Sequence, residues 1–146
     1  CLSKGLGAPV GSLVAGTKTF IDRVHRVRKM FGGGMRQAGI LAAAGIYALD
    51  HHIERLKEDH ENARRLAFGL KEIKGVSIEP EDVETNILIF DVAGTGMTSL
   101  QVGDAIKKEG VLILAVGKTQ IRLVTHLDVS KEDIEAALKA FKKVLG

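Results

Sequence analysis

A lysine near the start of the sequence has the surroundings that an amine needs for covalent chemistry. Lys4 lies in residues 3–12, Ser-Lys-Gly-Leu-Gly-Ala-Pro-Val-Gly-Ser, between a short polar lead and several glycines. A lysine that forms and breaks a Schiff base must lose its proton in a confined, partly desolvated place. Small neighbours let a cofactor ring approach the backbone closely. Composition alone would favour a solvated lysine, so the rest of the sequence decides between the two interpretations.

Two arginines have settings that suit anions. Arg36 follows the three glycines of residues 32–34 and precedes an apolar segment. Backbone amides, a helix start and a guanidinium can converge there on a phosphate, although a surface arginine that caps the helix is the plainer alternative. Arg122 lies between Ile121 and Leu123 in a predicted strand, where an arginine needs an anion unless it faces outward into solvent.

Four ordered motifs resemble those of threonine aldolases, which are fold-type-I enzymes that use pyridoxal 5′-phosphate (PLP). They are residues 3–12, 28–39, 59–64 and 121–126, and the likeness covers essentially the whole chain. It corresponds to the C-terminal part of a complete enzyme. Because the sequence begins with Cys1 and no strand precedes the lysine motif, we expect a C-terminal piece of a longer protein.

The resemblance implies an α/β fold, namely the C-terminal part of a fold-type-I PLP-dependent enzyme. Residues 1–50 would form the end of the cofactor-binding large domain, with the lysine motif, a basic helix and an apolar helix. Residues 51–146 would form a small C-terminal α+β domain. The missing N-terminal portion of the enzyme and a second subunit are the implied partners, in a homodimer or homotetramer.

The same resemblance gives each candidate residue a role. Lys4 would hold PLP as a Schiff base, which the incoming amino acid displaces. Arg36 would contact the cofactor phosphate, commonly across a dimer interface, with help from Lys29. Arg122 would bind the substrate α-carboxylate through two parallel hydrogen bonds and so orient the bond that breaks.

The implied enzyme is a carbon–carbon lyase that cleaves a small β-hydroxy-α-amino acid, L-threonine or L-allo-threonine, reversibly to glycine and acetaldehyde. Another fold-type-I lyase, for example a β-eliminating one, would share the same three anchors. A non-catalytic interaction module would instead use the apolar segment 38–49 for association. Because the ring-stacking group, the acid at the ring nitrogen and the hydroxyl base would lie upstream, we expect this chain alone to be inactive.

Composition excludes several other classes of protein. The chain is 45% hydrophobic and 27% charged, so it can build a core, and its single cysteine excludes an internal disulfide and favours the cytoplasm. No apolar run is long enough to span a membrane. A basic cluster raises the question of nucleic acid, but stacking aromatics are scarce and a small anion is the better partner. Its members are Lys18, Arg23, Arg26, Arg28, Lys29 and Arg36.

The histidines do not have the spacing of a metal site. His51, His52 and His60 lie in a charged segment that predicts a helix, without a pattern that gathers zinc ligands, so we expect no metal. His126 follows the Arg122 strand, where a hydrogen-bonded structural histidine is the favoured interpretation. Periodicity and turn residues predict helices over residues 18–30, 35–49, 51–74 and 98–108 and after Ser130, and strands over 13–15, 76–78, 86–92, 111–116 and 120–125.

Overall fold

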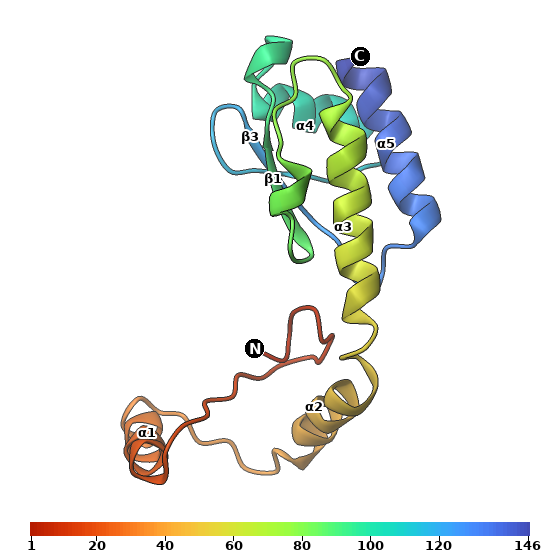
Figure 1. Cartoon of the computed structure of the whole chain (residues 1–146). Coiled ribbons are helices and arrows are strands. Elements are labelled where there is room, and N and C mark those ends of the chain that lie inside the picture. The colour runs from red at the N-terminus through yellow and green to blue at the C-terminus, as the bar shows by residue number, and fades with distance from the viewer. The chain divides into compact units, whose positions relative to one another are not determined.

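The computed structural model describes all 146 residues and divides into two compact units, Cys1–Arg55 and Leu56–Gly146. The division lies in the turn between the second and third helices, a few residues after the boundary at residue 50 that the sequence suggested. Figure 1 shows the elements of each unit. No helix is both long and apolar enough to cross a membrane.

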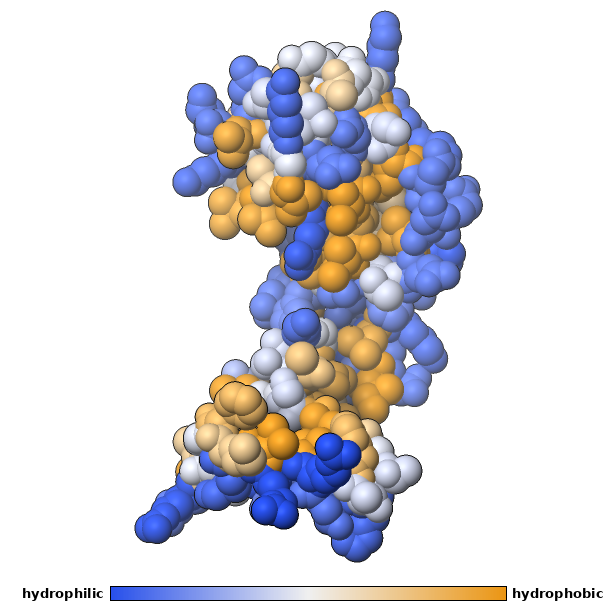
Figure 2. Space-filling model, turned by 90° about the vertical axis from the view of Figure 1, so that its left-hand side faces the viewer, coloured by the Kyte–Doolittle hydropathy of each residue, from blue (hydrophilic) through white to orange (hydrophobic).

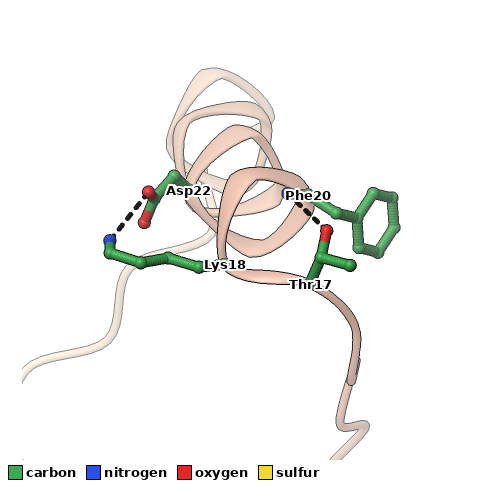
Figure 3. Close-up of polar contacts among 4 residues, drawn as sticks. All are labelled: Thr17, Lys18, Phe20 and Asp22. Carbon is green, nitrogen blue, oxygen red and sulfur yellow. Dashed lines mark hydrogen bonds and ion pairs between the residues drawn. The ribbon is translucent and has the colours of Figure 1, made fainter.

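The N-terminal unit consists of the lysine loop and two helices, α1 (Lys18–Met30) and α2 (Gly39–His51). Helix α1 begins as the sequence predicted, because the Thr17 hydroxyl accepts a hydrogen bond from the Phe20 amide at 3.4 Å. Lys18 and Asp22, one turn apart, form an ion pair at 2.9 Å on its exposed side (Figure 3). Helix α1 has no buried residue.

Two predictions for this unit were wrong, the start of the second helix and the strand at 13–15. Helix α2 begins at Gly39 and not at residue 35, because the chain after the three glycines is still turning and Gln37 adopts a positive φ of 50°. Of this apolar helix only Gly45 and Ala48 are buried within the chain. The predicted strand at 13–15 is absent, since the unit has no other strand to pair with it, and Leu13 is 68% exposed.

The C-terminal unit is a three-stranded antiparallel sheet with helices on one face. The elements are α3 (Leu56–Lys71), β1 (Ile87–Asp91), α4 (Ser99–Lys108), β2 (Leu114–Ala115), β3 (Gln120–Val124) and α5 (Lys131–Leu145), with single 3₁₀ turns at Pro80–Asp82 and Ala93–Thr95. The strand order is β1-β3-β2, so β3 lies in the middle. Helices α3, α4 and α5 lie on one side of the sheet (Figure 1).

The core of this unit follows from the alternation of side chains along the strands. In β1 and β3 every second residue is buried, which directs one set of side chains toward the helices. The rings of Phe90 and Phe141 meet edge to face with their centroids 5.7 Å apart. The strand and helix residues that close the core include Leu88, Ile121, Leu123, Leu66, Leu70, Val102, Ile106 and Ile134.

The predicted elements of this unit are confirmed where local signals define them. Helices α4 and α5 begin after Thr98 and Ser130, each of which forms a reciprocal capping box. The prediction of one helix over residues 51–74 was wrong, because a turn separates α2 from α3. The segment 76–78 forms only an isolated bridge between Ser77 and Asp91, and the strand expected at 111–116 is reduced to Leu114–Ala115.

Candidate functional site

Lys4 lies on a loop that closes on itself through backbone hydrogen bonds. The Gly7 amide donates to the Lys4 carbonyl at 2.8 Å, and the Ala8 amide donates to the Leu2 carbonyl at 3.0 Å. The Leu2 amide in turn donates to the Gly11 carbonyl at 2.9 Å. Gly7 adopts a φ of 70°, which glycine enters without steric cost. The turn therefore fixes the backbone of Lys4 while its side chain is exposed.

This loop is seated on helix α2. A Cβ atom at Gly45 would lie 3.1 Å from the Leu2 side chain, so the glycine allows Leu2 to approach the helix closely. The Nδ1 atom of His52 donates to the Leu6 carbonyl at 2.6 Å, across 46 positions of sequence. The sequence does not predict this bond, because no local pattern relates two residues so far apart.

The triple-glycine loop folds back on the end of α1 and brings Lys29 toward the segment that carries Arg36. The Gly33 amide donates to the Arg28 carbonyl at 2.7 Å. A Cβ atom at Gly34 would lie 2.6 Å from Lys29 Nζ, so the ammonium lies directly beside this glycine. Arg36 follows two positions later and is exposed. Two cations thus border one glycine loop, a donor set that suits a phosphate.

Arg122 occupies the middle of strand β3, on the sheet face that the helices do not cover. Its direct neighbours across the sheet are Ile89 on β1 and Leu114 on β2, which are 53% and 55% exposed. The Nε atom of Arg122 is buried among such neighbours and has no hydrogen-bond partner. A buried N–H without a partner is costly, and an anion against this face would satisfy it.

This uncovered face is largely apolar around the arginine, and its other polar residues, Gln120 and Asp91, pair at one end of β3 and β1. Figure 2 shows an orange area, interrupted by blue atoms, on the C-terminal unit. The exposed apolar residues of the three strands and their ends are Ile87, Ile89, Leu112, Leu114, Val116 and Val124. Apolar walls around a guanidinium reduce the competition from water for its N–H groups and strengthen its interaction with an anion.

The four predicted site residues are distributed over the two units. The N-terminal unit carries Lys4, Lys29 and Arg36, with Lys29 and Arg36 at one loop and Lys4 at another. The C-terminal unit carries Arg122. A pocket of about 410 Å³ in the C-terminal unit contains none of them; it is lined by Leu66, Glu109, Leu123, Thr125, Asp128, Phe141 and their neighbours.

The histidines make local contacts. His126 Nδ1 lies 3.4 Å from the Asp128 carboxylate, in agreement with the structural interpretation of this side chain. The His51 ring stacks on Tyr47 with centroids 4.1 Å apart, and the His52 ring meets the same Tyr47 edge to face at 5.7 Å. No three His, Cys, Asp or Glu side chains in the chain come together as metal ligands would.

Comparison with known proteins identifies the family. A sequence model of the beta-eliminating lyases matches residues 1–93. The chain therefore belongs to the beta-eliminating lyase family, whose members depend on PLP. It is a mixed α/β piece that matches part of a fold-type-I threonine aldolase, which confirms the resemblance found from the motifs.

The relatives show how much of such a protein the chain spans. Low specificity L-threonine aldolase of Escherichia coli (strain K12) is 52% identical over 134 residues, which are 92% of this chain and 38% of that protein. Low-specificity L-threonine aldolase 1 of Arabidopsis thaliana is 38% identical over 146 residues, 99% of this chain and 41% of that protein. Alanine racemase TOXG of Cochliobolus carbonum is 32% identical over 151 residues, 98% of this chain and 37% of that protein. The chain spans less than half the length of these curated relatives.

Proposed function

We propose that this chain supplies part of the active site of a PLP-dependent aldehyde-lyase that cleaves L-threonine or L-allo-threonine reversibly to glycine and acetaldehyde. The likeness to threonine aldolases along nearly the whole chain supports this reaction class. The structural observation that carries the proposal is the buried, unpartnered Nε of Arg122. A guanidinium with a free N–H in an apolar setting is suited to the one group that every amino acid substrate shares, its α-carboxylate.

The residues present fit PLP. Lys4 would hold the cofactor through its side-chain amine. Arg36 would bind the phosphate with Lys29, whose ammonium lies beside Gly34 of the glycine loop. When bound, PLP supplies an electron sink for the carbanion that forms at Cα as the Cα–Cβ bond breaks.

Arg122 would orient the substrate. Two parallel N–H···O bonds fix a carboxylate in one plane, and that plane sets the direction of the Cα–Cβ bond. Ile89 and Leu114 would exclude water from the guanidinium, since both lie directly opposite it in the sheet. The base that takes the β-hydroxyl proton would come from sequence outside this chain, so the isolated chain would be inactive.

The remaining parts of the proposal follow from the same likeness. The chain would be the C-terminal portion of its enzyme, with residues 1–50 from the large domain and residues 51–146 as the small domain. Its partners would be the rest of the enzyme and further copies in a homodimer or homotetramer, in the cytoplasm, without nucleic acid, membrane or metal. Helices α1 and α2 expose large apolar side chains beside the basic cluster. Such exposed apolar surface supports burial of this unit in an assembly.

The test uses the full-length gene product that contains this sequence. PLP is added, visible absorption is recorded before and after borohydride, and the modified residue is mapped by mass spectrometry. We expect a reducible band with the adduct on Lys4, no band in Lys4→Ala, and an unchanged band in Lys18→Ala, whose amine pairs with Asp22. A wild-type protein without an adduct on Lys4 would overturn the proposal.

Two other reactions each have a specific observation in their favour. The chain is similar to an alanine racemase as well as to aldolases, and its family is described by β-elimination. Product analysis separates the three reactions: glycine and an aldehyde for an aldolase, ammonia and a keto acid for a β-eliminating lyase, and loss of optical activity for a racemase. We expect glycine and acetaldehyde from L-threonine.

A further inference from the structure

The lysine loop accepts a side-chain hydrogen bond from a distant part of the chain. His52, the residue that ends α2, donates from Nδ1 to the Leu6 carbonyl at 2.6 Å. Leu6 lies two positions after Lys4, inside the turn that the Gly7 amide closes on the Lys4 carbonyl. A carbonyl oxygen can only accept, so the hydrogen resides on Nδ1. The imidazole therefore holds the same turn that presents the lysine.

The contact belongs to a continuous face of α2. Gly45, Ala48 and His52 follow one another at helical spacing, so they lie on one side of the helix over about two turns. Gly45 and Ala48 are the only buried residues of α2. Gly45 receives the Leu2 side chain at one end of this face, and His52 reaches Leu6 at the other. The loop is thus anchored on both sides of Lys4.

The imidazole is itself held in place. The Tyr47 ring meets the His52 ring edge to face, at 88° and 5.7 Å. The neighbouring His51 stacks on the same Tyr47 ring, but its Nδ1 bonds to the Tyr47 carbonyl of its own helix at 2.9 Å and not to the lysine loop. Of these two adjacent histidines, only His52 therefore bonds to the lysine loop.

We propose that His52 is a positioning residue for Lys4: its bond to the Leu6 carbonyl holds the turn Lys4–Gly7 so that the amine reaches the cofactor aldehyde in one orientation. This inference rests on the proposed function. Loss of the bond removes one of the contacts that hold this loop, and the amine then samples positions from which it cannot react. Misplacement of a reacting group by about 1 Å is enough to lower a rate on the order of a hundredfold.

The test compares His52→Ala, His52→Asn and His51→Ala in the full-length protein. The rate at which PLP becomes attached to Lys4 is followed by absorption, and kcat and KM are measured with L-threonine. We expect His52→Ala to lower the attachment rate and kcat by about ten- to a hundredfold with little change in KM. His52→Asn, which retains an N–H donor, recovers most of the loss, and His51→Ala behaves as wild type.

A second measurement needs no cofactor. Hydrogen exchange of the Gly7 and Ala8 amides, which donate within the loop, is followed in the cofactor-free proteins. We expect faster exchange in His52→Ala and no change in His51→Ala. Wild-type attachment and exchange rates in His52→Ala would overturn the inference.

The two proposals fail in different ways. If the wild-type protein forms no adduct on Lys4, the proposed function is wrong, and hydrogen exchange alone decides whether His52 holds the loop. If the wild-type adduct forms and His52→Ala forms it equally fast, the proposed function stands and the role of His52 is rejected.

Discussion

Arg122 owes its situation to the two-residue period of a strand. Ile121 and Leu123 point into the core, so the side chain between them must lie on the opposite face, beside Ile89 and Leu114. These aliphatic neighbours bury Nε without offering it an acceptor. An arginine that served only as a solvated strand residue would keep its N–H groups in contact with water.

The substitution Arg122→Lys tests whether this geometry binds a carboxylate. An ammonium is a point charge without the planar pair of donors, so it cannot reproduce two parallel bonds. We expect the KM for L-threonine to rise roughly ten- to a hundredfold, while attachment of PLP to Lys4 is unchanged. Steady-state kinetics and the absorption of the bound cofactor check the two parts.

A matched control is Arg65→Lys. Arg65 is an exposed arginine of α3 that pairs with Glu135 at 2.6 Å. Because exposed ion pairs contribute little, we expect this variant to keep the wild-type KM. An Arg122→Lys enzyme with the wild-type KM would contradict the assignment of the carboxylate site.

Asp91, at the end of β1, gives the stability a defined dependence on pH. The Ala93 amide and then the Thr119 hydroxyl, each 2.7 Å from a carboxylate oxygen, lower the pKa of Asp91 below its ordinary value of 3.8. A carboxyl whose pKa is lower in the folded state stabilises the fold fully above the unfolded pKa. That contribution is lost as the pH falls through the lower, folded pKa.

Thr119→Val should therefore reduce stability most at neutral pH. Loss of the Thr119 hydroxyl removes one of the two hydrogen bonds to the ionised Asp91 carboxylate. The difference in stability between the variant and the wild type should therefore shrink as the pH is lowered below 3.8. Urea unfolding midpoints of both proteins, measured from pH 7 down to the acid transition, test this. A difference that is constant over the whole pH range would show that Asp91 is not responsible.

At the scale of the elements, one close contact between two backbone turns holds the end of α3 near the end of β1. Gly75 has a φ of 86°, and a Cβ atom there would lie 2.5 Å from the Gly94 carbonyl carbon. Gly110, after α4, has a similar φ of 84° but nothing within 4 Å of its Cβ position. The two glycines therefore share a backbone conformation and differ only in the space around them.

This pair separates the cost of conformation from the cost of collision. Gly110→Ala should lower the free energy of unfolding by about 1 kcal/mol, the ordinary penalty for alanine at positive φ. Gly75→Ala should lower it by roughly 3 kcal/mol, because backbone must also move. Chemical denaturation of both variants measures the two values. Equal losses would mean that the contact with Gly94 is easily relaxed.

Local signals explain which elements could be predicted from the sequence. Thr98 with Gln101 and Ser130 with Asp133 form capping boxes within four residues, so the starts of α4 and α5 could be predicted from the sequence alone. The segments 13–15 and 76–78 have strand-like residues, but a strand exists only if another strand pairs with it. Pairing is decided by the whole fold: segment 13–15 pairs with no strand, and segment 76–78 pairs with β1 only through the bridge between Ser77 and Asp91.

The candidate site divides in the same way. Lys4, Lys29, Arg36 and Arg122 could be proposed from motifs because each motif is a short run of sequence. The bond between His52 and Leu6 and the enclosure of Arg122 Nε depend on residues brought together by folding. Neither has a signature in the sequence around it.

At the scale of the whole molecule, the two units differ in what they bury. All residues of the continuous hydrophobic core lie between Ala63 and Phe141, in the C-terminal unit. In the N-terminal unit the buried residues are Ala8, Gly45 and Ala48. Several of its large apolar side chains are exposed, among them Phe31 at 86% and Ile40 at 84%. Burial therefore stabilises the C-terminal unit far more than the N-terminal unit.

The two units should accordingly behave differently when they are produced alone. A fragment of residues 56–146 contains the complete sheet, three helices and the entire core, so we expect it to unfold cooperatively on heating. A fragment of residues 1–55 has too little buried apolar surface to offset the entropy of ordering its chain. It should show partial helix signal and no cooperative transition by circular dichroism. A cooperative transition in residues 1–55, or the absence of one in residues 56–146, would contradict this expectation. Either result would mean that the exposed apolar residues of the N-terminal unit stabilise this chain itself, and not only contacts with sequence outside it.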